Sequence, residues 1–176
     1  MSIVYARDVQ TCNGNVNFTL WGMASREPQP RKFHSAVGIG RNLFVWGGDG
    51  GSAKIQTATI ESFDVFSKAW DPPQQLLCSL PDDLRSIAAT TDGESAFFFG
   101  GATQGSKGFT YSNTLYQVNL STLQCRELVP RTPSRAPDKA SGVGLVYSNH
   151  KLVVYGGYSG KERGDKVYVF DMRTSE

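Results

Sequence analysis

Histidine and cysteine are scarce in this sequence, which has two of the former and three of the latter. His34 and His150 lie far apart, and neither has a second histidine or cysteine at the spacing of a metal site. Cys12, Cys78 and Cys125 form no Cys-x-x-Cys pair. We therefore expect no metal and no cofactor. We also expect a cytoplasmic protein with reduced thiols, because cysteine is usually reduced in that compartment.

Motifs of catalysis are also lacking. The sequence has no Gly-x-Ser-x-Gly element for a nucleophilic serine and no glycine-rich loop of the phosphate-binding type. Glu61 and Asp64 fall on one expected strand, three positions apart, so their side chains point to opposite faces and do not form a paired acid site. We therefore expect that the protein is not an enzyme.

Neither a strong charge nor a long apolar run is present. The formal net charge is +2, which does not indicate a nucleic-acid partner or a polybasic membrane patch. No apolar run approaches the roughly 20 residues that span a bilayer, so we expect no membrane partner. Hydrophobic residues make up 39% of the chain and charged residues 19%, a balance typical of a folded globular protein.

What the sequence does have is a repeated run of four apolar residues followed by two glycines. From Gly47 to Gly100 is 53 residues, and from Gly100 to Gly156 is 56 residues. A near-constant period of this size indicates a repeat architecture. The apolar runs are rich in residues that favour strands and occupy 43–46, 96–99 and 152–155. The glycine pairs that follow them are Gly47-Gly48, Gly100-Gly101 and Gly156-Gly157.

A second set of strands recurs after each glycine pair. Polar loops of variable length separate the two sets, and loops are where insertions are tolerated. Trp70 stands six residues after Asp64, and Cys125 stands six residues after Asn119. The second set of expected strands spans 60–63, 115–118 and 167–170, and the strands end near Asp64, Asn119 and Asp171.

This pattern resembles the kelch repeat, the roughly 50-residue unit of one class of β-propeller. The first repeat matches best, through His34, Gly47-Gly48, Asp64 and Trp70. The resemblance implies an all-β fold of kelch-type β-propeller blades, with about three four-stranded antiparallel units. We accordingly divide the chain into an N-terminal strand and connector at 1–30, then kelch repeats at 31–80, 81–135 and 136–176.

The two ends of the chain fit the repeat less well than its middle. Residues 17–21 read as a single short strand, followed by a proline-rich connector. The third repeat stops at Glu176, before the outer strand that a blade needs. We therefore expect an incomplete propeller, a fragment whose uncovered blade edges favour self-association.

The repeated glycines and Trp70 have structural explanations. A strand that turns sharply at its end often needs a positive φ, which glycine adopts without steric cost. The absence of a Cβ atom also lets a neighbouring blade approach. We expect these roles at Gly47, Gly48, Gly100, Gly101, Gly156 and Gly157, and we expect Trp70 to fill space between blades.

The leading functional hypothesis is a non-catalytic protein–protein interaction module that binds its partner through inter-strand loops. Arginine and lysine in these loops favour an acidic peptide, although they are also explained as ordinary solvated charges. The alternative is an enzyme or metal-binding propeller whose site lies on blades absent from this chain. The candidate binding residues are Lys54, Lys107, Arg131, Arg135, Lys161 and Arg163.

Overall fold

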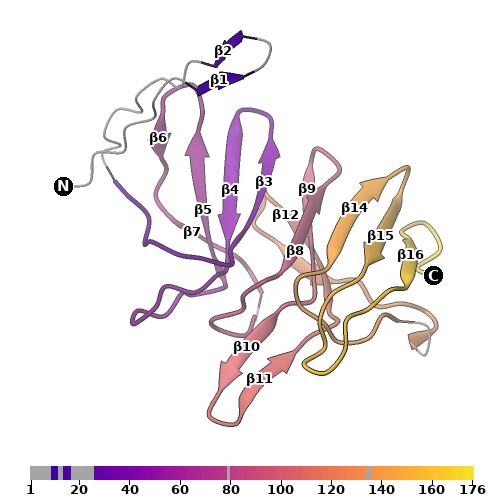
Figure 1. Cartoon of the computed structure of the whole chain (residues 1–176). Helices are drawn as coiled ribbons and strands as arrows, with labels where there is room; N and C mark the ends of the chain where they lie inside the picture. The colour runs from indigo at the N-terminus through magenta and orange to yellow at the C-terminus, as the bar shows by residue number, and fades with distance from the viewer. Residues whose placement is uncertain (1–8, 12–13, 17–25, 79, 134–135) are drawn as a thin grey trace.

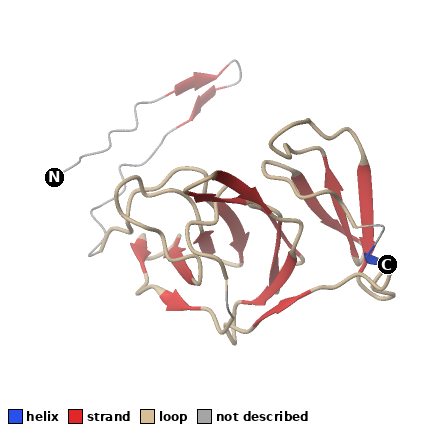
Figure 2. Cartoon of the chain, turned by 90° about the horizontal axis from the view of Figure 1, so that it is seen from below, coloured by secondary structure: helices blue, strands red, loops and turns tan. Residues whose placement is uncertain are grey.

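The computed structural model describes residues 9–11, 14–16, 26–78, 80–133 and 136–176. Strands and loops make up nearly all of this part of the chain, which is all-β (Figures 1 and 2). The strand expected at 17–21 lies outside the described residues. A short hairpin of β1 (Val9–Thr11) and β2 (Gly14–Val16) precedes the first blade in the chain.

Three antiparallel sheets correspond to the three expected repeats. The first contains β3 (Ser35–Ile39), β4 (Asn42–Trp46), β5 (Thr59–Asp64) and β6 (Ala69–Trp70), with β7 (Gln74–Gln75) also on β5. The second contains β8 (Ala88–Thr91), β9 (Ser95–Phe99), β12 (Leu115–Asn119) and β13 (Cys125–Glu127). The third contains β14 (Gly144–Ser148), β15 (Lys151–Tyr155) and β16 (Val167–Asp171). The six strands expected beside the glycine pairs are confirmed.

The sheets are arranged as blades around their innermost strands. β8 lies beside β3 on one side and β14 on the other. The three described sheets form an arc and no closed propeller (Figure 1). Each sheet therefore covers one face of the next, as blades of a propeller do.

The blades are joined at equivalent backbone positions. Phe33, Ser86 and Gly142 all have a positive φ, and each precedes an innermost strand. The Ser86 N–H donates to the Phe33 carbonyl at 2.8 Å, and the Gly142 N–H donates to the Ser86 carbonyl at 3.0 Å. β8 and β14 therefore begin two residues after Ser86 and Gly142, because Ser86 and Gly142 link blades and do not extend a strand.

The core consists of two apolar seams between neighbouring blades. Trp46 of the first blade packs edge-on against Phe98 of the second, with ring centroids 3.6 Å apart. Phe97, the next residue, faces the other way and stacks on Tyr147 of the third blade at 5.8 Å. Both phenylalanines are fully buried because β9 has a blade on each side. The alternation of side chains along β9 thus supplies both seams.

Trp70 does not have the position expected of it. Its side chain is half-buried and contacts Phe63 of the same blade, with ring centroids 5.2 Å apart. Trp46 is the tryptophan that fills the space between blades and is 1% exposed. The reason is that β6 is a short outer strand, far from the seam that β4 faces.

The recurrence of Asp64 and its equivalents at a strand end has a local cause. The Asp64 carboxylate accepts hydrogen bonds from the backbone N–H groups of Phe66 and Ser67, at 2.8 and 3.0 Å. Asn119 uses its side-chain oxygen in the same way in the second blade. These side chains stabilise the turn that leads to the outer strand, which is why either residue serves there.

The expectation of reduced thiols at Cys78 and Cys125 is wrong. These two residues form a disulfide, and their Cα atoms are 5.4 Å apart. Leu77 and Gln124 pair in parallel beside it, and the Leu77 N–H donates to the Leu123 carbonyl at 2.8 Å. The chain after the first blade therefore runs along the outer strand of the second, which brings together cysteines 47 residues apart in sequence.

Candidate interaction surface

The loops that follow the glycine pairs share one end of the blades. Each leaves the second strand of its blade, and the three second strands run in the same direction (Figure 1). We call the surface formed by loops 47–58, 100–114 and 156–166 the lower rim, after its place in Figure 1. The opposite ends of the strands carry tight turns, including the one at 65–68.

The lower rim holds four of the six candidate binding residues. Lys54 lies on the loop of the first blade, and Lys107 on that of the second. Lys161 and Arg163 lie on the loop of the third blade. All four are exposed, and within the described ranges no carboxylate lies within 4 Å of their charged groups. Their charge is therefore available to a partner.

The remaining two candidates are not placed on this rim. The backbone N–H of Arg131 donates to the Ser175 carbonyl at 2.8 Å, beside the turn that follows β16. Its side chain is exposed. Arg135 lies outside the described residues.

One other charged residue of the lower rim, Asp49, already has partners. The Asp49 carboxylate forms ion pairs with Arg85 at 3.0 Å and with Lys32 at 3.6 Å. The Gly51 N–H donates to the same carboxylate, and this bond, with Arg85 and Lys32, holds the pKa of Asp49 below its usual value. This cluster links the first and second blades and leaves less charge free there than on the loop of the third blade.

Three aromatic side chains of the lower rim were not expected from the sequence. Segment 102–112 reads as a loop rich in Gly and Ser, but the structure shows a hairpin of β10 (Ala102–Gly105) and β11 (Gly108–Tyr111). Phe109, Tyr111 and Tyr158 adjoin one another across the second and third blades. The signal in the sequence is the alternation of Phe109 and Tyr111 directly after a Gly-Ser-Lys-Gly turn.

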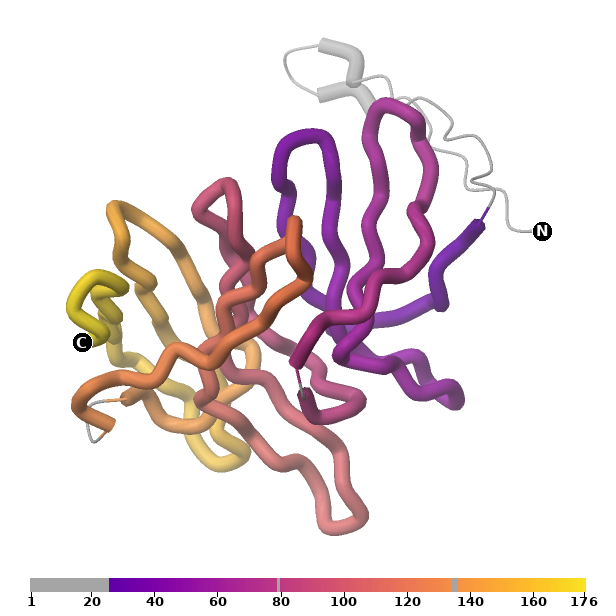
Figure 3. The backbone as a smooth tube through the Cα atoms, turned by 180° about the vertical axis from the view of Figure 1, so that it is seen from behind, coloured from indigo at the N-terminus to yellow at the C-terminus, as the bar shows by residue number. Residues whose placement is uncertain are grey.

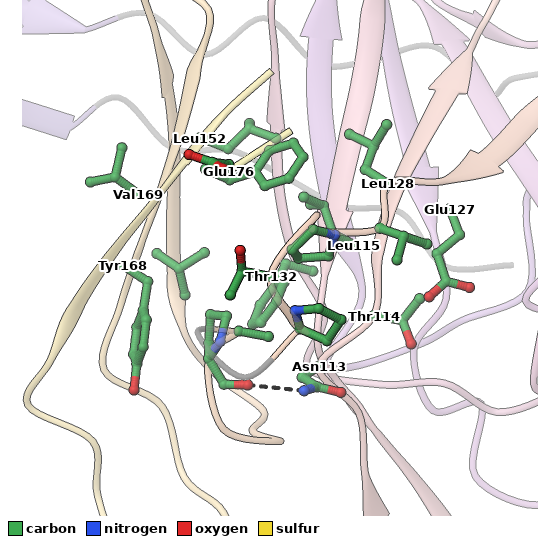
Figure 4. A pocket seen from close by; sticks show the side chains of 18 residues that line it. Asn113, Thr114, Leu115, Glu127, Leu128, Thr132, Leu152, Tyr168, Val169 and Glu176 are labelled. Atoms are coloured by element: carbon green, nitrogen blue, oxygen red, sulfur yellow. Dashed lines mark hydrogen bonds between the residues drawn. The ribbon is translucent and has the colours of Figure 1, made fainter. Parts of the chain in front are cut away.

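A cavity of about 370 Å³ lies between the second and third blades (Figure 4). Its lining is mainly apolar and includes Leu115 and Leu128 from one blade and Tyr168 and Phe170 from the other. The Asn113 side-chain amide, at its edge, donates to the Pro137 carbonyl at 2.9 Å. The cavity therefore continues the apolar seam outward, and its polar lining includes Glu127 and Glu176.

A more polar hollow of about 560 Å³ adjoins this cavity on the side of the lower rim. Connector 137–143 and loop 156–166 form its walls, and its lining includes Lys139, Lys161 and Arg163. Asp138, Glu162 and Asp165 also line it, so its charge is mixed. The hollow extends the lower rim without defining a small-molecule site.

Glu61 and His150, two of the residues considered for catalysis or metal binding, have structural positions. Glu61 is buried and binds Arg26 at 2.6 Å and Arg31 at 3.2 Å. Burial lowers the pKa of Arg31, although the Glu61 carboxylate opposes this effect. His150 occupies the β14–β15 turn with a positive φ.

No group of three His, Cys, Asp or Glu residues able to hold a metal occurs in the part of the chain described. No helix in this part is long and apolar enough to cross a membrane.

Comparison with known proteins agrees with the repeat found in the sequence. Residues 139–176, which contain the third blade, match the family model described as Kelch motif. The chain is 24% identical over 175 residues to human Kelch domain-containing protein 10. The matched region is 95% of this chain and 38% of that protein. It is 25% identical over 163 residues to human Host cell factor 1, covering 86% of this chain and 8% of that protein.

A nematode relative shows the same partial coverage. The Caenorhabditis elegans Host cell factor homolog hcf-1 is 29% identical over 137 residues, which is 75% of this chain and 16% of that protein. The chain thus spans well under half the length of these curated relatives. None of the three names denotes an enzyme.

Proposed function

We propose that this chain of kelch-type blades is a non-catalytic protein-interaction module that binds an acidic peptide segment of a partner on its lower rim. The observation that carries the proposal is the placement of Lys107, Lys161 and Arg163 on adjacent loops of two blades. All three are exposed, and no described carboxylate lies within 4 Å of their charged groups.

The chemistry of these side chains favours carboxylates as ligands. Hydrogen bonds between a cationic donor and a carboxylate are stronger than neutral ones, and arginine can form two in parallel. Exposed cations also attract an acidic partner over distances of about a Debye length, roughly 8–10 Å at ordinary ionic strength. The strands beneath hold the loops in fixed positions, which lowers the entropic cost of binding.

The proposal is tested by selecting displayed random peptides on the immobilised chain and measuring their affinity by fluorescence anisotropy. We expect selected peptides rich in Asp and Glu, with binding that weakens as salt increases. A triple variant, Lys107→Glu with Lys161→Glu and Arg163→Glu, should bind them at least about tenfold more weakly. A tenfold change in Kd corresponds to a loss of about 1.4 kcal/mol of binding free energy.

The matched control is Lys68→Glu, which reverses one exposed lysine in the turn at the opposite ends of the strands. This variant should bind the selected peptides as the parent does. Selected peptides that bind the parent and the triple variant equally would place the binding surface elsewhere.

A further inference from the structure

The β10–β11 hairpin gives the second blade a feature that the other two blades lack. Where they have irregular loops, the second blade projects two paired strands from the lower rim (Figures 1 and 3). Residues 104–110 of this hairpin are exposed. The hairpin therefore presents its side chains to a partner from a regular backbone.

Three aromatic rings form a continuous row from this hairpin to the third blade. Phe109 and Tyr111 are two positions apart on β11 and so lie on the same face. Their ring centroids are 6.5 Å apart, and the Tyr111 ring is 6.1 Å from that of Tyr158, which it meets edge to face. We call these three residues the aromatic row. Phe109 remains 51% exposed and Tyr158 43% exposed.

Backbone contacts fix the middle and the far end of the row. A Cβ atom on Gly160 would lie 2.7 Å from Tyr111 Cε2, so the Tyr111 ring packs directly on the glycine. The Tyr158 hydroxyl donates to the Gly160 carbonyl at 2.9 Å. Tyr158 also exchanges backbone hydrogen bonds with Ser141. Rings held in this way lose little conformational entropy when a partner binds.

Cations flank the aromatic row at both ends. Lys107 lies in the turn of the hairpin, two residues before Phe109. Lys161 and Arg163 lie on the loop that carries Tyr158, and the Tyr158 backbone pairs with that of Arg163. Glu162 stands between them, but its carboxylate pairs with neither cation among the described contacts. The surface is thus an apolar strip with cationic side chains at both ends, and the third-blade end also carries the carboxylates of Glu162 and Asp165.

We propose that the aromatic row is the anchor site of an acidic peptide, where an apolar side chain of the peptide packs between carboxylates that meet the flanking cations. This inference rests on the proposed function and adds the second determinant of the partner. Aromatic residues and arginine are the side chains that most often dominate binding energy at interfaces. An apolar strip with cations on both sides fits a peptide with the reverse arrangement, an apolar residue with acids on both sides.

The test uses the peptides selected on the immobilised chain and the variant Phe109→Ala. We expect an apolar residue at a fixed position between acidic residues in the selected peptides. Phe109→Ala should weaken their binding by about tenfold or more, the effect of removing an interface anchor. An unchanged thermal midpoint would show that this half-exposed side chain is not needed for folding.

The matched control is Phe66→Ala, which removes a 79% exposed phenylalanine from the turn at the opposite ends of the strands. Its binding should equal that of the parent. The anchor site would be excluded if the acidic peptides had no fixed apolar position, or if they bound Phe109→Ala as tightly as the parent. Either result would still agree with the proposed function. Peptides that depend on neither Phe109 nor the three cations would overturn both.

Discussion

The carbonyl oxygen of Ala140 lies 2.5 Å from the place where a Cβ atom would stand on Gly100. Ala140 belongs to the next blade, and its carbonyl accepts from the Gly101 N–H at 3.0 Å. Leu84 has the same relation to Gly47, with its carbonyl at 2.6 Å. The first glycine of each of these pairs therefore leaves room for a backbone atom of the neighbouring blade.

This relation predicts different costs for two otherwise equivalent substitutions. Gly100 and Gly156 have similar φ values, +71° and +74°, so alanine is strained at both by about 1–3 kcal/mol. Only at Gly100 would the new Cβ also displace a neighbouring blade, because the closest atom to a Cβ on Gly156 is 3.7 Å away. Chemical denaturation should show that Gly100→Ala lowers the free energy of unfolding more than Gly156→Ala. Equal losses would mean that the backbone strain alone accounts for the glycine.

The disulfide between Cys78 and Cys125 should contribute to stability. It joins residues 47 positions apart, and cross-links of this length typically stabilise by about 2–4 kcal/mol through the unfolded chain. Cys78→Ser should therefore lower the thermal midpoint under oxidising conditions. In the presence of a reductant, the thermal midpoints of parent and variant should differ only by the effect of replacing the Cys78 thiol with a hydroxyl.

Thiol counting gives an independent check of the same bond. The sequence has three cysteines, so the denatured, unreduced protein should expose one free thiol. Three free thiols in freshly purified protein would show that the pair is reduced, as is usual for cytoplasmic proteins.

Acid should weaken the turn that Asp64 stabilises. Hydrogen bonds from Ser67 and Phe66, together with Arg41, hold the pKa of Asp64 below its usual value. A group with a lowered pKa in the folded state stabilises above the unfolded pKa, about 3.9 for Asp, and this stability is lost as the pH falls through the folded pKa. The urea midpoint of the parent should thus decrease below about pH 4.

The substitution Asp64→Asn separates the effect of the negative charge from the effect of the hydrogen bonds in the turn. Asparagine keeps the side-chain oxygen that accepts both N–H groups, as Asn119 does in the second blade. When the pH is lowered from 7 to 3, the urea midpoint of the variant should therefore decrease less than that of the parent. Asp82→Asn, an exposed substitution, serves as the control and should keep the acid sensitivity of the parent.

Self-association should occur through the uncovered face of the third blade. Val146, Tyr155, Val167 and Val169 are each more than half exposed on this sheet. Cross-strand pairing places Val153 beside both Val146 and Val169, which makes the apolar surface continuous. Apolar patches of this kind drive association. Light scattering should show a mass above 19.2 kDa that increases with concentration.

Val169→Lys should reduce that association, because a charge on an edge strand opposes contact with another chain. Val65→Lys offers a control, since Val65 is similarly exposed but lies in the turn after β5. A parent protein that remains a monomer at all concentrations would exclude this face as a contact surface.

The period of the glycine pairs was enough to predict the main strands of this protein and the loops between them. Strands β4, β9 and β15 and their neighbours follow from local patterns, because apolar runs with β-branched and aromatic residues favour strands and glycine favours the turns that end them. The rim position of Lys107, Lys161 and Arg163 follows from the same period, because loops after equivalent strands emerge at the same end.

The tertiary structure alone decided which distant residues meet. The disulfide joins Cys78 to Cys125 because a connector crosses from one blade to the next, and no local pattern encodes that crossing. Trp46, and not Trp70, fills the space between blades, because burial depends on what the neighbouring sheet brings opposite each strand. The aromatic row likewise depends on two loops that touch only after the blades pack, since Tyr111 and Tyr158 lie far apart in the sequence.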